Sequence, residues 1–245
     1  GESPNADTLT PQDINVVLTQ YACLYMYTDK VADMYEDDVP SEMKKLTGER
    51  MGLLREKIRY GALKACTNKF YSGGTTRLTV DEALTATVLS KAVRSLLANR
   101  ADPVNRILPG SGDANTTPIE GGFLFFGHTD FEYDIRALAG FVPCASYGQR
   151  KQVHEMELGS WQRIRFILSP ELDSVIDSGA AVGTTGLKST GTSTIDVFFG
   201  ILTGDEAWGD VTLRGMNGFD MVHLPPGQKD KSDPLGQKGY IGAKF

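Results

Sequence analysis

Three histidines, His128, His154 and His223, are the side chains in this sequence best suited to acid–base chemistry or metal binding. His128 lies two residues before Asp130, and such a pair can hold a metal ion or share a proton. It also lies where a strand is expected to pass into a helix, a common place for a polar side chain. His154 lacks the second histidine of the zinc-protease motif. We therefore interpret His128 as a junction residue.

Two glycine-rich stretches, 110–112 and 183–191, raise the question of phosphate binding. Neither places a lysine and a hydroxyl residue as a phosphate-binding P-loop does, and neither follows a strand at the right spacing. The acidic stretch 36–38 could coordinate a hard cation, but charge just before a helix explains it more simply. Aromatic residues at 123–126 and 198–199 are expected in strands, as core rather than a base-stacking platform.

Because none of these motifs is complete, the sequence predicts no catalytic residue, no cofactor-binding residue, no metal ligand and no cofactor. The chain is accordingly expected not to be an enzyme. One alternative stays open, because active sites often assemble from residues far apart in the sequence. A hydrolase that uses dispersed carboxylates would be supported by two buried carboxylates that converge in a pocket.

The composition is that of a folded globular protein. The 245 residues are 40% hydrophobic and 23% charged, enough for one large domain or two modest ones. The 25 basic and 31 acidic residues give a net charge of −6, the opposite of what neutralising phosphates requires. No apolar run is long enough to span a bilayer. Three cysteines (Cys23, Cys66, Cys144) lack zinc or redox spacing and are expected to be reduced thiols in a cytosol.

The first half of the chain is expected to hold long elements. Alternating apolar residues predict one strand over residues 12–27, about 50 Å long at 3.3 Å per residue, followed by a short helix that Thr28 caps. Apolar residues at three-and-four spacing predict a helix over 41–65, capped by Ser41 and about 37 Å long. The capping-box pattern from Thr79 to Glu82 predicts a helix over 80–99.

The second half is expected to be mostly strands. They are predicted at 122–127, at 156–168 with a break at Gly159, and at 195–202, 211–214 and 239–245. A second capping box at 129–132 predicts a helix to Leu138, and loops are expected at 109–118 and, as a mobile one, at 184–194. Strands and helices do not alternate regularly, so the predicted fold class is α+β.

Several segments together resemble the major capsid proteins of tailed bacteriophages, in the branch typified by N4-like podoviruses. The most specific is residues 232–245, with the sequence SDPLGQKGYIGAKF. Further matches, in the family's order, lie at residues 128–136 (HTDFEYDIR), 140–143 (GFVP), 147–148 (YG), 156–159 (MELG) and 163–166 (RIRF).

This resemblance implies the Hong Kong 97-type coat-protein fold. Residues 1–30 would form the end of an extended loop and a long strand, and residues 31–102 the peripheral domain with a long spine helix. Residues 103–224 would form the axial domain, and residues 225–245 would return to the peripheral domain. The family's N-terminal arm and the strand after Phe245 have no counterpart here, so an open sheet edge is expected.

The function implied is a coat protein that self-assembles, as pentamers and hexamers, into an icosahedral shell around phage double-stranded DNA. Expected partners are other copies of the chain, scaffolding and portal proteins, and decoration proteins. The DNA would be enclosed without sequence-specific binding, and no membrane is involved. The protein would lie in the virion and, during assembly, in the host cytoplasm. An encapsulin-like nanocompartment shell around protein cargo is the alternative.

Overall fold

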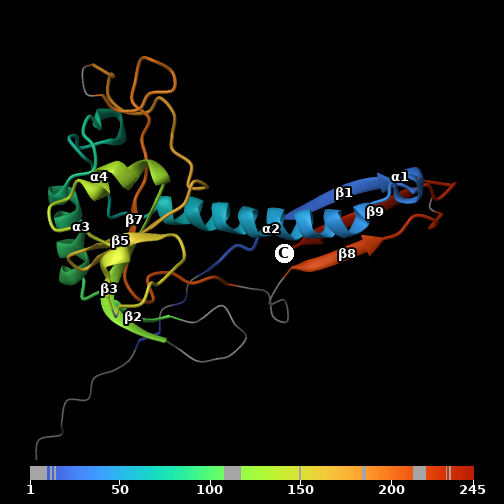
Figure 1. Ribbon diagram of the computed structural model, residues 1–245, viewed down its shortest axis with the longest axis horizontal. Coiled ribbons are helices and arrows are strands. Elements are labelled where there is room, and N and C mark those ends of the chain that lie inside the picture. Colours follow the sequence, from blue (N-terminus) through green and yellow to red (C-terminus); the bar gives the residue numbers. More distant parts are fainter. Residues whose placement is uncertain are drawn as a thin grey trace, which may run out of the picture. The chain divides into compact units, whose positions relative to one another are not determined.

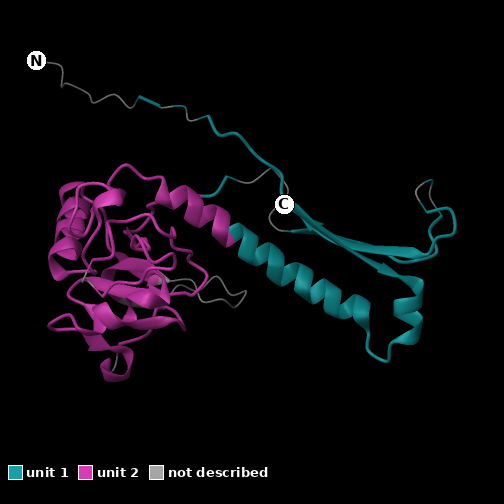
Figure 2. Ribbon diagram, turned by 90° about the horizontal axis from the view of Figure 1, so that it is seen from above, with its two compact units in different colours: residues 1–55, 210–245 teal, residues 56–209 magenta. Residues whose placement is uncertain are grey.

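The computed structural model divides into two compact units (Figure 2). Unit 1 comprises residues 1–55 and 210–245, and unit 2 comprises residues 56–209. The residues that the structure describes are 10, 11, 13, 15–107, 117–148, 150–183, 186–211, 219–229, 231 and 233–245. The expected division into peripheral and axial domains stays a prediction.

Unit 1 contains a three-stranded antiparallel sheet in the order β1 (Ala22–Thr28), β9 (Lys238–Lys244), β8 (Asp220–Leu224) (Figure 1). Strand β9 confirms the strand predicted at 239–245, whereas β8 was not predicted. The long strand predicted over 12–27 is wrong in extent, because residues 15–20 are not in a strand; residues 12 and 14 lie outside the described residues. The sequence pattern predicts a strand, but only the residues that find a partner strand form one.

The helices of unit 1 begin with α1 (Asp29–Met34), followed by α2 (Val39–Lys64), which continues into unit 2. Helix α2 confirms the helix predicted over 41–65, but it starts two residues earlier. Asp38 is its cap instead of Ser41, since the Asp38 carboxylate accepts the Ser41 amide at 3.3 Å. Thr28 precedes α1 as predicted, yet its side chain makes no capping hydrogen bond.

Helix α2 covers the part of the inner sheet face of unit 1 that β1 and β9 form, whereas the residues of β8 stay exposed. Tyr27 and Ile241 are buried on the sheet, and Met51 is fully buried on the helix. Arg50 donates a hydrogen bond to the Tyr25 hydroxyl at 3.2 Å, and its guanidinium lies 5.6 Å from the centroid of that ring. The glycines of α2 do not serve this packing, because a Cβ at any of positions 48, 52 and 61 would meet no atom within 4 Å.

Unit 2 is built on a six-stranded sheet. Its order is β2-β3-β6-β5-β4, and β7 pairs with β3. The strands are β2 (Val104–Ile107), β3 (Thr117–Gly127), β4 (Val142–Pro143), β5 (Glu157–Trp161), β6 (Ile164–Leu168) and β7 (Ile201–Thr203). Strands β3 and β6 run parallel, and the other pairs are antiparallel. Together with the helices, this gives the mixture of helix and sheet that the sequence predicts.

The strand predictions for unit 2 are confirmed in part. The predicted strand 122–127 lies within β3, and the hairpin predicted within 156–168 is β5 and β6. The break lies after Trp161, however, where Gln162 has a φ of +51°. Gly159 lies inside β5 opposite Pro143 of β4, where a Cβ would collide with the Val142 carbonyl oxygen. The glycine therefore serves close strand packing and not a turn.

The remaining strand and loop predictions have mixed outcomes. The strand predicted at 195–202 is reduced to β7, with only an isolated bridge from Val197 to Val175. For the strand predicted at 211–214, Val211 is not in a strand and the other residues lie outside the described part. The loop predicted at 109–118 also lies largely outside the described residues, although residues 117 and 118 belong to β3. The loop predicted at 184–194 has no regular strand or helix in its described residues.

Both capping-box predictions are wrong. Helix α3 runs over Ala86–Ala98, preceded by the 3-10 turn Arg77–Thr79. The Thr79 hydroxyl accepts the Thr75 and Thr76 amides at 3.1 Å within that turn, so it does not cap the helix. Threonine side chains bond locally to the backbone in turns as readily as at helix starts.

The second capping box lies at a 3-10 turn, Thr129–Phe131, which leads into α4 (Glu132–Arg136). His128, not Thr129, is the cap: its Nδ1 accepts the Asp130 amide at 3.0 Å. Helix α4 ends at Arg136 instead of Leu138. A further 3-10 turn, Cys144–Ser146, follows β4.

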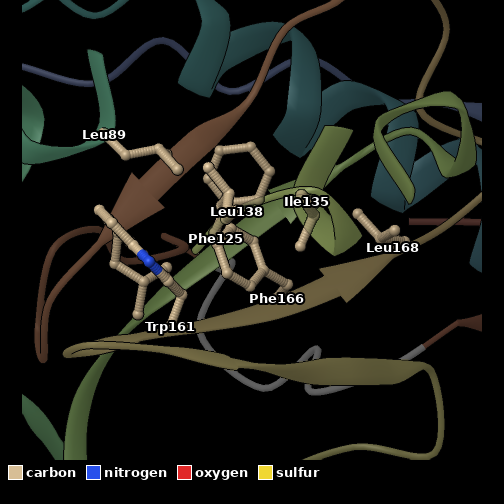
Figure 3. Close-up of a cluster of buried hydrophobic side chains, with 8 residues drawn as sticks. Leu89, Phe125, Ile135, Leu138, Trp161, Phe166 and Leu168 are labelled. Atoms are coloured by element: carbon tan, nitrogen blue, oxygen red, sulfur yellow. The ribbon is translucent and has the colours of Figure 1, made fainter. Parts of the chain in front are cut away.

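The core of unit 2 lies between the sheet and helices α3 and α4 (Figure 3). Phe125 of β3 and Phe166 of β6 meet edge to face with ring centroids 5.3 Å apart. The Trp161 indole N–H donates to the Ala139 carbonyl oxygen at 2.9 Å. The cluster also contains Leu89, Ile135, Leu138, Ile164 and Leu168. Phe125 thus confirms the core role predicted for the aromatic residues of this strand.

Candidate functional site

His128 lies at the strand-to-helix junction, as the sequence predicts. Its Nδ1 accepts the Asp130 amide, so that nitrogen is engaged with the backbone. The Asp130 carboxylate is 2.5 Å from the Lys188 ammonium, and the Phe198 ring centroid is 5.1 Å from the imidazole centroid. Asp130 is thus neutralised by a lysine, and this arrangement suits a helix start better than a proton relay.

The other candidates for metal binding have structural partners. His154 Nδ1 accepts the Met156 amide at 3.1 Å, and His223 Nε2 lies 2.9 Å from the Tyr27 hydroxyl oxygen. In the acidic stretch 36–38, Asp38 caps α2. Among the residues that the structure describes, no group of three or more His, Cys, Asp and Glu side chains is placed to hold a metal ion.

A buried ion pair between Glu157 of β5 and Arg165 of β6 was missed from the sequence. The Glu157 side chain is fully buried, with one oxygen 3.6 Å from the guanidinium. The carboxylate also accepts the Tyr147 hydroxyl at 2.7 Å and the Val153 amide at 2.6 Å. Burial first, and then this neighbouring carboxylate, raise the pKa of Tyr147. The pair therefore fastens Tyr147, Lys151 and Val153 to the sheet, because Tyr147 and Val153 donate to the Glu157 carboxylate and the Lys151 carbonyl oxygen accepts from Arg165.

The sequence held a signal for this pair: a charged residue stands on each strand of the predicted hairpin 156–168. Only pairing of β5 with β6 decides that both point inward. Burial also raises the pKa of the neighbouring Cys144 thiol, whose Sγ lies 3.1 Å from the Glu157 carbonyl oxygen. The thiol is therefore a structural hydrogen-bond donor, as expected of a thiol outside any redox motif.

In the glycine-rich stretch 183–191, the described residues Thr190 and Gly191 bind carboxylates. The Asp196 carboxylate accepts the Thr190 hydroxyl at 2.6 Å and the Asp177 amide at 3.0 Å. Asp177 in turn accepts the Gly191 amide at 3.0 Å. Burial alone would raise the pKa of Asp196, but these hydrogen bonds and the charge of Lys188 lower it. A phosphate would meet two acidic side chains here; the stretch 110–112 lies outside the described residues.

A cavity of about 1070 Å³ lies in unit 2, beside α3 and the segment 195–202. Four carboxylates are among its lining residues: Glu82, Asp130, Asp134 and Asp196. Asp130 is exposed and paired with Lys188, while burial raises the pKa of Asp134, which accepts the Leu84 amide at 3.4 Å. Glu82 is exposed as well, so Asp196 is the one fully buried carboxylate of this lining, and the cavity does not present the two buried carboxylates that the hydrolase alternative requires.

The outer face of the unit 1 sheet is the most unusual surface. Strand register aligns Leu24 with Gly242 and Val222, and Met26 with Tyr240 and Leu224. Four of these side chains are exposed: Leu24 at 67%, Met26 at 52%, Val222 at 44% and Leu224 at 41%. We call these four residues the outer sheet face. Soluble monomers rarely leave a contiguous apolar patch in water, so such a face marks a contact surface.

Other parts of unit 1 expose apolar side chains as well. Val17 in the segment before β1 is 91% exposed, and Leu46 and Leu53 lie one heptad apart on α2, also exposed. Met34 and Tyr35, at the end of α1, and Leu235, before β9, are also exposed large apolar residues. Unit 1 thus exposes apolar side chains on its sheet, on α2 and near α1. The candidate functional site is therefore a set of surfaces and not a pocket.

Comparison with solved structures gives a likeness of fold. The chain is similar to one in the head structure of Helicobacter pylori bacteriophage KHP40, with 12% sequence identity and a TM-score of 0.56. The match covers 93% of this chain and 65% of that one, so this chain spans about two thirds of that chain's length. At this identity the likeness concerns the fold alone, and it supports the coarser prediction of a fold like that of a phage head protein.

No protein-family model and no curated protein matches this sequence. Within the described ranges, no helix has the length and apolar character needed to cross a bilayer.

Proposed function

We propose that this chain is the major capsid protein of a tailed bacteriophage, of the N4-like branch, with the Hong Kong 97-type coat-protein fold. It assembles with copies of itself, as pentamers and hexamers, into an icosahedral shell around double-stranded DNA. It has no catalytic activity and needs no cofactor. It resides in the virion, after assembly in the host cytoplasm.

The observation that carries this proposal is the outer sheet face. A folded chain that leaves Leu24, Met26, Val222 and Leu224 in water needs a partner that covers them. The fold likeness to a phage head chain supports a shell as the place where that partner is found. Many copies with several modest contacts each make a stable lattice, so no single contact has to be strong.

The net charge of −6 is compatible with this function. A shell encloses DNA without gripping it, so a sequence-specific or strongly basic surface is not required. Scaffolding, portal and decoration proteins are the further partners that such a shell uses. Within the proposed fold, residues 31–102 and 225–245 form the peripheral domain with α2 as the spine helix, residues 103–224 the axial domain, and residues 1–30 the end of the extended loop.

The test is assembly. The full chain, expressed with and without a scaffolding protein, should form closed shells or capsomers that electron microscopy and sedimentation detect. The double variant Leu24→Ser/Val222→Ser should fold and yet reduce the fraction of subunits in shells about tenfold or more, since both contacts recur in every subunit. The matched control is Ile176→Ser, an exposed apolar residue of unit 2.

Only stable monomers of the wild-type chain, with and without scaffold, would overturn the shell proposal. Equal loss of shells in the control and the double variant would show that the outer sheet face has no special role. Shells that package a protein cargo and no DNA would favour the nanocompartment over the phage.

A further inference from the structure

The cavity of unit 2, with a volume of about 1070 Å³, combines a buried apolar lining with an exposed one. Leu89 of α3 and Phe125 of β3, two buried residues of the core, belong to its lining (Figure 3). Three large apolar side chains of the lining, Phe70, Leu78 and Tyr133, are exposed. Pockets that bind small molecules measure about 300–1,000 Å³ and are mostly apolar. The cavity therefore has the size and the lining of a ligand site.

One wall of the cavity is the connection between α2 and α3, residues 65–85. All of these residues are described, and their regular structure is one short 3-10 turn. Connections longer than about 12–15 residues without structure of their own are uncommon and usually functional. The Ser72 hydroxyl donates to the Ala83 carbonyl oxygen at 2.5 Å, and the Val80 carbonyl oxygen accepts the Ala180 amide at 3.0 Å. These bonds hold the wall in place, so the cavity is preformed.

Two lysines of the lining already have partners within the chain. The Lys188 ammonium is 2.5 Å from the Asp130 carboxylate, and the Lys64 ammonium lies 5.4 Å from the centroid of the Phe199 ring. The other basic side chains of the lining, both exposed, are Lys69 and Arg77. Water and salt screen exposed charges of this kind. The lining therefore offers an anionic ligand no buried cation that is free of a partner in the described chain.

Asp134 of α4 is a half-buried carboxylate of the lining that forms no ion pair with a described side chain. Within the described part of the chain, the single group that donates to it is the Leu84 amide, at 3.4 Å. Burial raises the pKa of this carboxyl, and the hydrogen bond from Leu84 offsets the effect only in part. A positive charge nearby favours the ionised form of such a group, whereas a negative charge disfavours it. Asp134 is therefore placed to attract a cation into the cavity.

We propose that this cavity binds a small amphiphilic amine, whose apolar body lies between α3 and residues 65–85 and whose protonated amino group pairs with Asp134. A neutral apolar ligand would leave the carboxylate unpaired, and an anionic ligand would bring a like charge beside it. A small polar amine would gain little, because the favourable energy comes from displacing water from Leu89, Phe125 and their apolar neighbours. Binding is independent of shell assembly, since the whole lining lies in unit 2 of one copy.

Calorimetric titration of the full chain with three probes tests the class of ligand. Octylamine, octanoate and octanol share one alkyl chain and differ in charge. Octylamine should bind about tenfold more tightly than either of the others, because a charged hydrogen bond that is partly withdrawn from water contributes about that much affinity. Equal affinities for octylamine and octanoate, or no binding of octylamine, would overturn the amine site and leave the shell function standing.

Two variants test the location of the site. Asp134→Asn keeps the shape of the side chain and should weaken octylamine binding about tenfold, while octanol binding changes by less than about twofold. Ala92→Phe fills the cavity beside α3 and should weaken the binding of all three probes. The matched control is Asp81→Asn, an exposed carboxylate outside the lining, which should bind octylamine like the wild type.

Unchanged octylamine binding in Asp134→Asn, or an equal loss in Asp81→Asn, would overturn the pairing with Asp134. Unchanged binding in Ala92→Phe would overturn the cavity as the site. Tryptophan fluorescence, from Trp161 and Trp208 of unit 2, verifies that each variant is folded.

Discussion

Units 1 and 2 bury their apolar side chains in different ways. In unit 2, Phe125, Phe166 and Trp161 are enclosed between the sheet and helices α3 and α4. In unit 1, α2 covers only part of the inner face of a three-stranded sheet, and the outer face stays apolar and open. An antiparallel sheet with one face in water normally alternates apolar and polar residues. Unit 2 therefore encloses its large apolar side chains, whereas unit 1 leaves apolar side chains exposed.

The strongest test of the contrast is in the core of unit 2. Phe166→Ala should lower the free energy of unfolding of unit 2 by about 3–5 kcal/mol, because it removes a fully buried ring and leaves a cavity. Denaturant titration followed by tryptophan fluorescence reports on this unit alone, since both tryptophans, Trp161 and Trp208, lie in it. Tyr133→Ala, which removes an exposed ring, is the control and should change the value by less than about 0.5 kcal/mol. Equal effects would contradict the enclosed core.

The buried ion pair comes next. Glu157→Gln leaves the Arg165 charge buried without its counter-ion, so unit 2 should lose about 3 kcal/mol of unfolding free energy. The matched change is Glu132→Gln, which breaks an exposed pair with Arg136 at 2.8 Å and should cost about 0.3–0.5 kcal/mol. Both are measured by the same titration. If Glu157→Gln lowers the free energy of unfolding no more than Glu132→Gln does, the buried pair does not hold Tyr147, Lys151 and Val153 on the sheet.

A smaller effect is expected at the start of α2 in unit 1. Asp38→Ala should destabilise the first turn by about 1 kcal/mol, because the Ser41 amide loses its side-chain acceptor and keeps only the Asp38 carbonyl oxygen, at 3.1 Å. Thr28→Ala is the control, as the Thr28 side chain makes no capping hydrogen bond to α1. Hydrogen exchange of the amides at 41–43 measures the difference. If these amides exchange no faster in the Asp38 variant than in the wild type, Asp38 is not the cap.

The smallest effect on the isolated chain is expected on the outer sheet face. Leu24→Ser should change the unfolding of unit 1 by less than about 0.5 kcal/mol, because the side chain is already 67% exposed. Hydrogen exchange of the β1 amides in the unassembled chain measures this. A loss as large as that of a core residue would mean that Leu24 supports the fold itself, and the contrast between the two units would fail.

Elements whose pattern is long and local were predictable from the sequence. The helix over 41–65 repeats its apolar residues at three-and-four spacing through several turns. It is continuous although it contains three glycines. The strands at 122–127 and 239–245 are short, and their residue types favour strands in any context. The placement of His128 between a strand and a helix followed from the same local patterns.

Features that depend on a distant partner were decided only by the tertiary structure. The pattern over 12–27 is continuous, yet among its described residues only those from Tyr21 onward make strand hydrogen bonds, because such bonds need a second chain segment. Thr79 bonds to a turn instead of a helix start, and Glu157 meets Arg165 only because β5 folds back on β6. The sequence thus determined which segments are apolar and periodic. Packing between residues far apart in the chain decided which of these segments are buried and which stay exposed on unit 1.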